Sequence, residues 1–259
     1  MRSSPTLRRG KIQVIGLFFT AVVLLGTTLG FVSTTPVSAA TPTFVQTRAN
    51  EIIAGTTNSL AFSSANTAGN LIVVYVLWSN AGAVTVSDSK GNAYSNVGTA
   101  TRWNNNAWSS QVFYAKNVLG GANTVKAVFG TSINSFGIIY IHEYSGMDKV
   151  NPLDVNAAAI GSGSAMNSGS ATTTNGNDLI FGAAGSISTV TQVGTGFTSR
   201  STSYANRTED KKVSTTGSYN ATATQNGSAW VMHMVAFRAD AGTPDTTAPS
   251  IPTGLTATS

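Results

Sequence analysis

Hydrophobic residues between positions 41 and 240 occur in short runs, and almost none recur with the 3.6-residue period of a helix. The run LIVVYVLW (71–78) is continuously apolar, which predicts a central strand buried on both faces. AVTVSDS (83–89) follows as a second strand. SSQVFYAKNV (109–118) and NTVKAVF (123–129) predict a further pair joined by a glycine turn. The pattern indicates a chain built from β-strands.

The remaining strands extend this pattern to residue 240. SFGIIYIHEY (135–144) is largely apolar until its last residues, and a passage rich in Gly, Ser and Ala covers 145–177. The strands expected after it are DLIFGAA (178–184), EDKKV (209–213), GSYNATAT (217–224) and AWVMHMVAF (229–237). We therefore predict an all-β fold: an antiparallel two-sheet β-sandwich, jelly-roll-like, with about a dozen strands, forming one domain over residues 41–240.

The first 40 residues have the pattern of a secretory signal peptide. Four basic residues precede an apolar stretch over 14–29, and TTPVSAA (34–40) supplies small residues for cleavage after Ala39 or Ala40. The apolar stretch is short for a membrane span and is interrupted by Gly and Thr, so an uncleaved anchor is the weaker alternative. We expect a secreted, extracellular protein that can associate with the cell surface and has no membrane segment after cleavage.

Removal of this segment changes the charge balance. Four of the 15 Lys and Arg residues lie in it, which leaves 11 cations against 10 anions. A basic stripe that could neutralise phosphates is therefore not expected, and nucleic acid is excluded as a partner. The chain has no cysteine, so its stability must come from the hydrophobic core, and thiol catalysis and cysteine metal sites are excluded.

The composition changes after Asp240. AGTPDTTAPS (241–250) predicts an extended Pro/Thr linker. In DTTAPSIPTGLTATS (245–259) a pair of prolines precedes GLTAT, and this stretch resembles the opening of a fibronectin type III domain in bacterial secreted proteins. The resemblance implies that residues 251–259 are the truncated start of such a domain and that neighbouring domains of the same chain are partners.

The body also carries a resemblance, which depends on the order of several segments. These are TAGNLIVVYVLW (67–78), VSDSKGNAY (86–94), VFYAKNVLGGANTV (112–125), EYSGMDKVNPLDV (143–155), NDLIFGAA (177–184), GFTSR (196–200) and GSYNATAT with AWVMHMVAF. Their order is similar to that in a β-sandwich module of bacterial surface proteins and polysaccharide-acting exoenzymes. The resemblance implies a jelly-roll-like accessory domain without catalytic residues, in a parent protein whose catalytic domain, where it has one, is separate.

Candidate catalytic and metal-binding residues are few. His142 shares a strand face with Tyr140, whereas Glu143 points to the opposite face, and His233 alternates with apolar residues on the last strand. A zinc site needs three or four converging ligands, so we expect two hydrogen-bonded core histidines and no metal or cofactor. Glu143 is expected to make a structural hydrogen bond to the loop that follows it.

Other polar motifs are explained by turns. DSKGN (88–92) is better explained by an Asx turn than by a calcium loop, because Asp88 can accept backbone N–H groups and Gly91 allows positive φ. The serine of YSGMD (144–148) lacks the strand-to-helix context of a hydrolase nucleophile. No particular pair of carboxylates can be brought together from the sequence, so no catalytic residue is predicted.

The stretch RWNNNAW holds the best candidate binding residues. If Asn105 and Asn106 form a two-residue turn, Asn104 pairs with Ala107 and Trp103 lies opposite Trp108. Two rings on one face of a hairpin, with three asparagines at the rim, form a platform that could stack on a sugar.

The alternative is that these rings close the end of the core. Trp108 shares its strand face with Ser110, Val112 and Tyr114, which is the more apolar face of that strand. Because an apolar face is usually buried, this interpretation is favoured over ligand stacking.

Together these features predict a non-catalytic extracellular binding module within a larger modular protein. A polysaccharide or cell-surface glycan is the preferred ligand, and surface adhesion is the next. The alternatives are a structural spacer without a ligand and, more remotely, a glycoside-acting hydrolase.

Overall fold

In the computed structural model the described residues, 39–242, are almost entirely β-structure, with eighteen strands in five antiparallel sheets and one 3-10 turn, η1 (Ser203–Ala205). The predicted all-β sandwich is confirmed, with more strands and more sheets than the dozen and the two expected. The predicted signal peptide apart from Ala39 and Ala40, and the linker and fibronectin-like segment beyond Gly242, lie outside the described residues.

The first half of the domain, residues 43–145, forms two sheets. Its inner sheet contains, in spatial order, β1 (Thr43–Ile52), β8 (Gly137–Ser145), β3 (Leu71–Trp78), β6 (Trp108–Ala115) and β5 (Tyr94–Trp103). Its outer sheet contains β2 (Gly55–Ala61), β7 (Thr124–Ile133) and β4 (Val84–Asp88). This is the strand order of a jelly roll, except that β5 extends the inner sheet instead of the outer one.

The second half, residues 153–238, repeats this arrangement. Its inner sheet contains β9 (Leu153–Gly161), β18 (Trp230–Arg238), β12 (Asp178–Ser186), β15 (Arg207–Val213) and β14 (Thr198–Ser201). Its outer sheet contains β10 (Ala165–Asn167), β17 (Thr222–Gln225) and β13 (Val190–Val193), beside a short pair, β11 (Ala171–Thr172) and β16 (Ser218–Tyr219). The order β1-β8-β3-β6-β5 thus recurs as β9-β18-β12-β15-β14. The domain consists of two similar sandwiches in tandem, a repeat that the sequence does not reveal.

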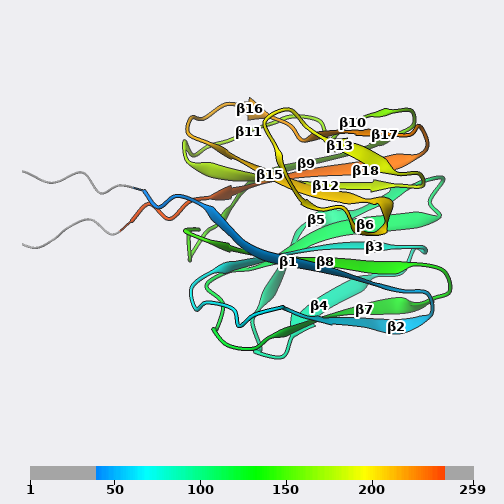
Figure 1. The fold of residues 1–259 in the computed structure, drawn as a ribbon, viewed down its shortest axis with the longest axis horizontal. Coiled ribbons are helices and arrows are strands. Elements are labelled where there is room, and N and C mark those ends of the chain that lie inside the picture. The colour runs from blue at the N-terminus through cyan, green and yellow to red at the C-terminus, as the bar shows by residue number, and fades with distance from the viewer. Residues whose placement is uncertain (1–38, 243–259) are drawn as a thin grey trace, which may run out of the picture. The chain divides into compact units, whose positions relative to one another are not determined.

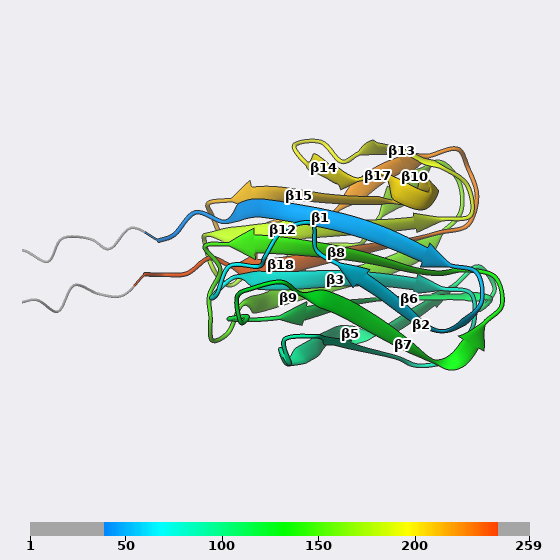
Figure 2. The same ribbon diagram turned by 60° about the horizontal axis from the view of Figure 1, so that its bottom comes forward.

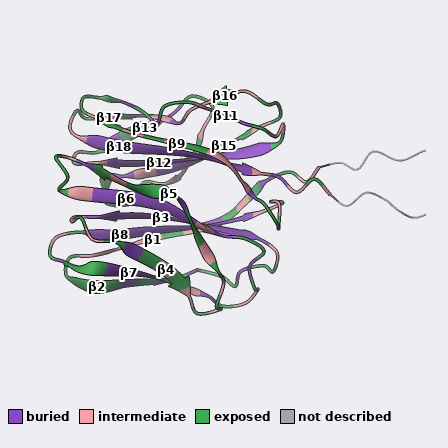
Figure 3. Ribbon diagram, turned by 180° about the vertical axis from the view of Figure 1, so that it is seen from behind, coloured by how far each residue is buried: buried purple, intermediate pink, exposed green. Residues whose placement is uncertain are grey.

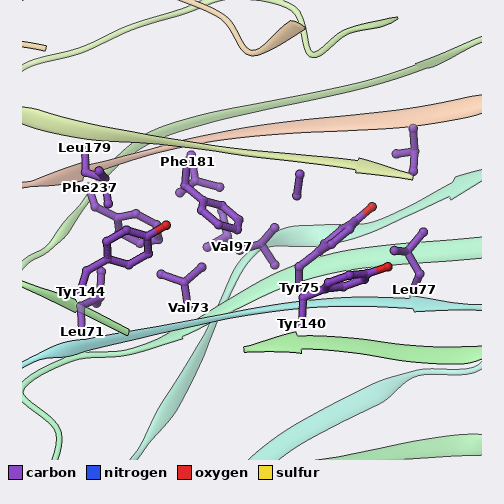
Figure 4. Close-up of a cluster of buried hydrophobic side chains, with 14 of the residues drawn as sticks. Leu71, Val73, Tyr75, Leu77, Val97, Tyr140, Tyr144, Leu179, Phe181 and Phe237 are labelled. Carbon is purple, nitrogen blue, oxygen red and sulfur yellow. The ribbon is translucent and has the colours of Figure 1, made fainter. Parts of the chain in front are cut away.

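The sheets stack in four layers, with the two inner sheets facing each other (Figure 1). One core cluster lies between the inner sheets, and the other two lie between each inner sheet and its outer sheet. The central strands of the inner sheets, β8, β3, β6, β18 and β12, are almost wholly buried, whereas the edge strands of these sheets and the outer strands are partly or largely exposed (Figure 3). All eight residues of β3 are buried because both faces of the strand are covered: Val73 and Tyr75 point into the central cluster, and Val74 and Val76 point away from it (Figure 4).

One expectation about strand pairing is wrong. The strands predicted at 109–118 and 123–129 do not pair, because β6 lies in the inner sheet and β7 in the outer one. The passage 145–177, described from the sequence only as rich in Gly, Ser and Ala, contains β9, β10 and β11. β9 is rich in alanine, and it pairs along its whole length with β18. Alternation reports which face of a strand is buried but not which sheet the strand joins.

The strands give the domain two distinct ends. β1 begins and β18 ends at one end, where the N–H of Ala40 donates to the carbonyl of Asp240 at 2.8 Å. We call this end the base, and the opposite end, with the β5–β6 hairpin, the tip (Figure 2). Both ends of the described chain therefore leave from the base.

Candidate functional site

The β5–β6 hairpin at the tip has the predicted geometry. Trp103 pairs with Trp108, and the N–H of Ala107 donates to the carbonyl of Asn104 at 3.1 Å. Asn105 and Asn106 have φ of 55° and 63°. Asparagine adopts this left-handed conformation more readily than most residues, which explains the asparagines in the turn.

The two tryptophans differ in exposure. Trp103 is 1% exposed and belongs to the central core cluster, whereas Trp108 is half-buried at its end. Their ring centroids are 5.6 Å apart. Trp108 also stacks with Phe136, at 5.6 Å and an interplanar angle of 17°. The hairpin therefore closes the end of the core with Trp103 and continues outward as a row of rings through Trp108 to Phe136.

This row borders a cleft of about 210 Å³ at the tip. The first half supplies Glu51, Leu77, Trp103, Trp108, Phe136 and Ile138, and the second half supplies residues 186–188 and 204–206. Asn104, Asn105 and Asn106 are not among the lining residues. Of the five predicted binding residues, the structure brings the two tryptophans to the cleft and leaves the three asparagines outside it.

Tyr204 lies in the wall that the second half supplies. It is 41% exposed, and it contacts Tyr140 edge to face at 6.5 Å. Tyr204 and Ala205 both have left-handed φ, of 55° and 58°. Such a conformation is unfavourable for these residue types and persists only where the surroundings enforce it.

Hydrogen bonds hold this loop in place. Asn206 accepts the N–H of Ser186 at 3.0 Å and donates to the hydroxyl of Tyr140 at 3.0 Å. The Tyr140 hydroxyl donates in turn to the carbonyl of Ser203 at 2.9 Å. Both side chains are buried. The ring of Tyr204 is thus presented by a fixed loop.

Glu51 supplies the charge of the cleft. It is the next-to-last residue of β1 and pairs with Ile138, a residue of the central cluster, so its side chain points towards the second half. Within residues 39–242 its carboxylate makes no hydrogen bond or ion pair. Partial burial raises its pKa above the usual value. The cleft therefore combines aromatic rings with one unpaired carboxylate.

The two histidines are buried in the central core, as the sequence predicts. Nε2 of His142 lies 2.8 Å from the hydroxyl of Thr208, and Nε2 of His233 lies 2.7 Å from that of Ser110. Burial lowers the pKa of His142 to about 3 and that of His233 to about 4. They lie on facing sheets, and no three metal-ligating residues converge anywhere in the described part of the chain.

Glu143 is fully buried, and it binds the loop before β3, not the loop after β8 that the sequence suggests. Its oxygens accept hydrogen bonds from Gln46, Asn66, Asn70 and the backbone N–H of Thr67, at 2.6–2.8 Å. The prediction failed because β3 is the neighbour of β8 in the sheet. Adjacency in space therefore decides which loop the carboxylate reaches.

Asp88 forms the predicted turn. One carboxylate oxygen accepts the N–H groups of Lys90 and Asn92, and the other accepts side-chain donors of Asn92, Tyr94 and Asn123. Gly91 has φ of 77°. Both oxygens are occupied by protein donors, which explains this motif without a bound ion.

Sequence reasoning missed Phe136, Tyr204 and Glu51 as members of one site. Phe136 precedes β8 in a turn and is 39% exposed, and Tyr204 lies in η1. The available signal was that both aromatic residues stand next to polar, turn-forming residues. Only the packing of the two halves brings them together.

No helix within residues 39–242 is long and apolar enough to cross a membrane. Comparisons of the chain with protein-family models, with curated proteins and with solved structures find no match.

Proposed function

We propose that this protein is a non-catalytic, extracellular binding module that holds one ring of a carbohydrate in the tip cleft. The observation that carries the proposal is the arrangement of Trp108 and Phe136 on one side of the cleft and Tyr204 on the other. Sugar rings have apolar C–H faces that stack on aromatic rings, and hydroxyl groups that bind polar groups at the rim.

The size of the cleft supports a small ligand unit. Its volume of about 210 Å³ is below the roughly 300–1,000 Å³ of pockets that enclose drug-sized molecules. One sugar ring with its substituents suits that volume, and the rest of a glycan would extend into solvent. The preformed loop at 202–206 lowers the entropic cost of ordering the wall on binding.

The position of the cleft suits a module of a larger protein. Both ends of the described chain leave from the base, so neighbouring domains would leave the tip free. Secretion through the predicted signal peptide, a fibronectin type III neighbour and adhesion to a glycan-bearing surface are parts of this proposal. Any catalytic activity would belong to another domain of the parent protein.

Hydrolysis in the cleft is disfavoured by its chemistry. Glycosidases use two carboxylates across the scissile bond, and Glu51 is the single carboxylate among the residues that line the cleft within the described chain. The remaining alternative is a spacer without a ligand.

Binding of a glycan panel, followed by tryptophan fluorescence and calorimetry, tests the proposal. Phe136→Ala and Tyr204→Ala should each weaken binding about tenfold, in line with roughly 1–1.5 kcal/mol for an aromatic contact. Leu119→Ala is the matched control, because Leu119 is 57% exposed and lies near the base. Should no glycan bind, or should both tip variants bind like the wild type, the spacer interpretation would replace this one.

A further inference from the structure

The unpaired carboxylate of Glu51 indicates what kind of sugar the cleft would take. Phe136, Trp108 and Tyr204 line the same cleft as this carboxylate, and none of the described lining residues is a cation. Within residues 39–242 the other titratable residues close to it are Tyr140 on β8, the strand paired with β1, and Tyr204 on the facing loop of the second half. The site is therefore negatively charged and has no counter-ion from its own walls.

Arginines on β1, β5 and β15, three strands that run to the tip, are bound elsewhere. Arg48 donates to the carbonyl of Ala61 and Arg102 to that of Ala81. Arg207 donates to the carbonyl of Val190. Each guanidinium is held by a backbone carbonyl, and none of the three lines the cleft. Within residues 39–242 no side chain supplies a positive charge to Glu51, so a cationic ligand would be its partner.

Resting on the proposed function, we propose that the cleft binds a sugar with a free, protonated amine, that is, a de-N-acetylated amino sugar. Its ammonium group would pair with the carboxylate of Glu51, and its ring would lie against Phe136 and Tyr204. Aromatic faces attract cations through their quadrupole, and a charge-assisted hydrogen bond in a partly buried site is stronger than a neutral one. Partial burial, which raises the pKa of Glu51, adds to the benefit of a cationic partner.

Three oligosaccharides of equal length and linkage test the inference: a glucosamine oligomer, its N-acetylated form and the glucose oligomer. Calorimetry at low salt and near neutral pH should find the glucosamine oligomer bound about tenfold or more tightly than the other two. Glu51→Gln should remove this preference and leave the weaker stacking contribution to all three. The preference of the wild type should also decline as salt is raised, because the pair is partly exposed.

Asp148→Asn is the matched control. Asp148 is also half-buried but lies near the base, where it accepts the N–H groups of Val150 and Asn151, so its replacement removes one negative charge without touching the cleft. This variant should keep the preference.

The outcomes separate the two proposals. Equal binding of the three oligomers, or a preference that survives in Glu51→Gln, overturns the amino-sugar inference while the binding function stands. Absence of binding to every oligomer, with unchanged thermal unfolding of the protein, overturns both.

Discussion

The two halves of the domain have the same strand order but fill their interiors in different ways. In the first half β3 carries Trp78, which lies opposite Gly137 of β8. At the equivalent place in the second half β12 carries Ser186, which lies opposite Trp230 of β18. Each pair contains one large and one small residue. The tryptophan is on β3 in the first half, but in the second half it is on β18, the equivalent of β8. At this place both halves combine one large and one small side chain across neighbouring strands, but not the same residue at the same position.

The buried carboxylates differ in a similar way. Glu143 of the first half accepts four hydrogen bonds, whereas Glu209 of the second half, 1% exposed, accepts one, from the N–H of Gly194 at 2.9 Å. The other oxygen of Glu209 has no partner among the described residues. Burial raises the pKa of Glu209 to about 7. The same topology thus contains one carboxylate with hydrogen bonds to both oxygens and one whose pKa is raised by burial.

Because each half has one buried tryptophan opposite a small residue, loss of either tryptophan should lower stability by the same amount. Trp78→Ala and Trp230→Ala should each lower the free energy of unfolding by about 4 kcal/mol, because both rings are buried opposite a small residue that cannot fill the cavity. Urea unfolding measures the change, with Leu119→Ala as an exposed control. A loss confined to Trp78→Ala would mean that the second half packs loosely and that the comparison of volumes is wrong.

Replacement of Glu143, whose carboxylate accepts four hydrogen bonds, should lower the free energy of unfolding almost as much. In Glu143→Gln one of the two groups that accept hydrogen bonds becomes a donor and faces the donors of the loop before β3. We expect a loss of about 3–4 kcal/mol, in the range for breaking a buried, charged network. Hydrogen exchange should show that residues 63–70 open first. A loss below about 1 kcal/mol would contradict the view that this carboxylate anchors the loop.

Glu209→Gln should have the opposite effect: at neutral and alkaline pH it should raise the free energy of unfolding. The pKa of Glu209 is raised from 4.5 to about 7 by folding, so its contribution to stability is full below about pH 4.5 and is lost as pH rises through 7. The neutral amide lacks this dependence. Between pH 4 and pH 8 the variant should therefore gain about 3 kcal/mol relative to the wild type.

The measurement is urea unfolding of both proteins across this pH range. Other titrating groups, including Asp178, whose pKa burial raises to about 6, are common to both proteins and cancel in the difference. A difference that does not change with pH would show that Glu209 is ionised in the folded protein and would remove the contrast with Glu143.

These contrasts explain which features of the structure could be predicted from the sequence. The strand at 71–78 and the Trp103–Trp108 pairing were predictable because alternation and turn chemistry are local. The tandem repeat was not, because equivalent positions such as Val74 and Gly182 differ in size and only their places in the sheets agree. The cleft was also hidden, since Phe136 and Tyr204 meet only through the packing of the two inner sheets.

The loops that connect β5 to β6 and β14 to β15 give the smallest and most local test of the comparison. They occupy equivalent places in the two halves, and both have consecutive left-handed residues: Asn104 to Asn106 in the first half, Tyr204 and Ala205 in the second. Asparagine tolerates this conformation, whereas alanine does not. Ala205→Gly should therefore raise the free energy of unfolding by about 0.5–1 kcal/mol, and Asn105→Gly should change it by only a few tenths.

Thermal and urea unfolding of the two glycine variants measure this difference directly. Asn105 does not line the cleft, so glycan binding by Asn105→Gly is the control and should stay within about twofold of the wild type. If Ala205→Gly stabilises the protein but weakens binding, the strained conformation is needed to present Tyr204. If both variants change stability equally, the second half carries no more backbone strain than the first. The strain would then be a common property of both tip loops, instead of a consequence of placing an aromatic residue where the first half uses asparagine.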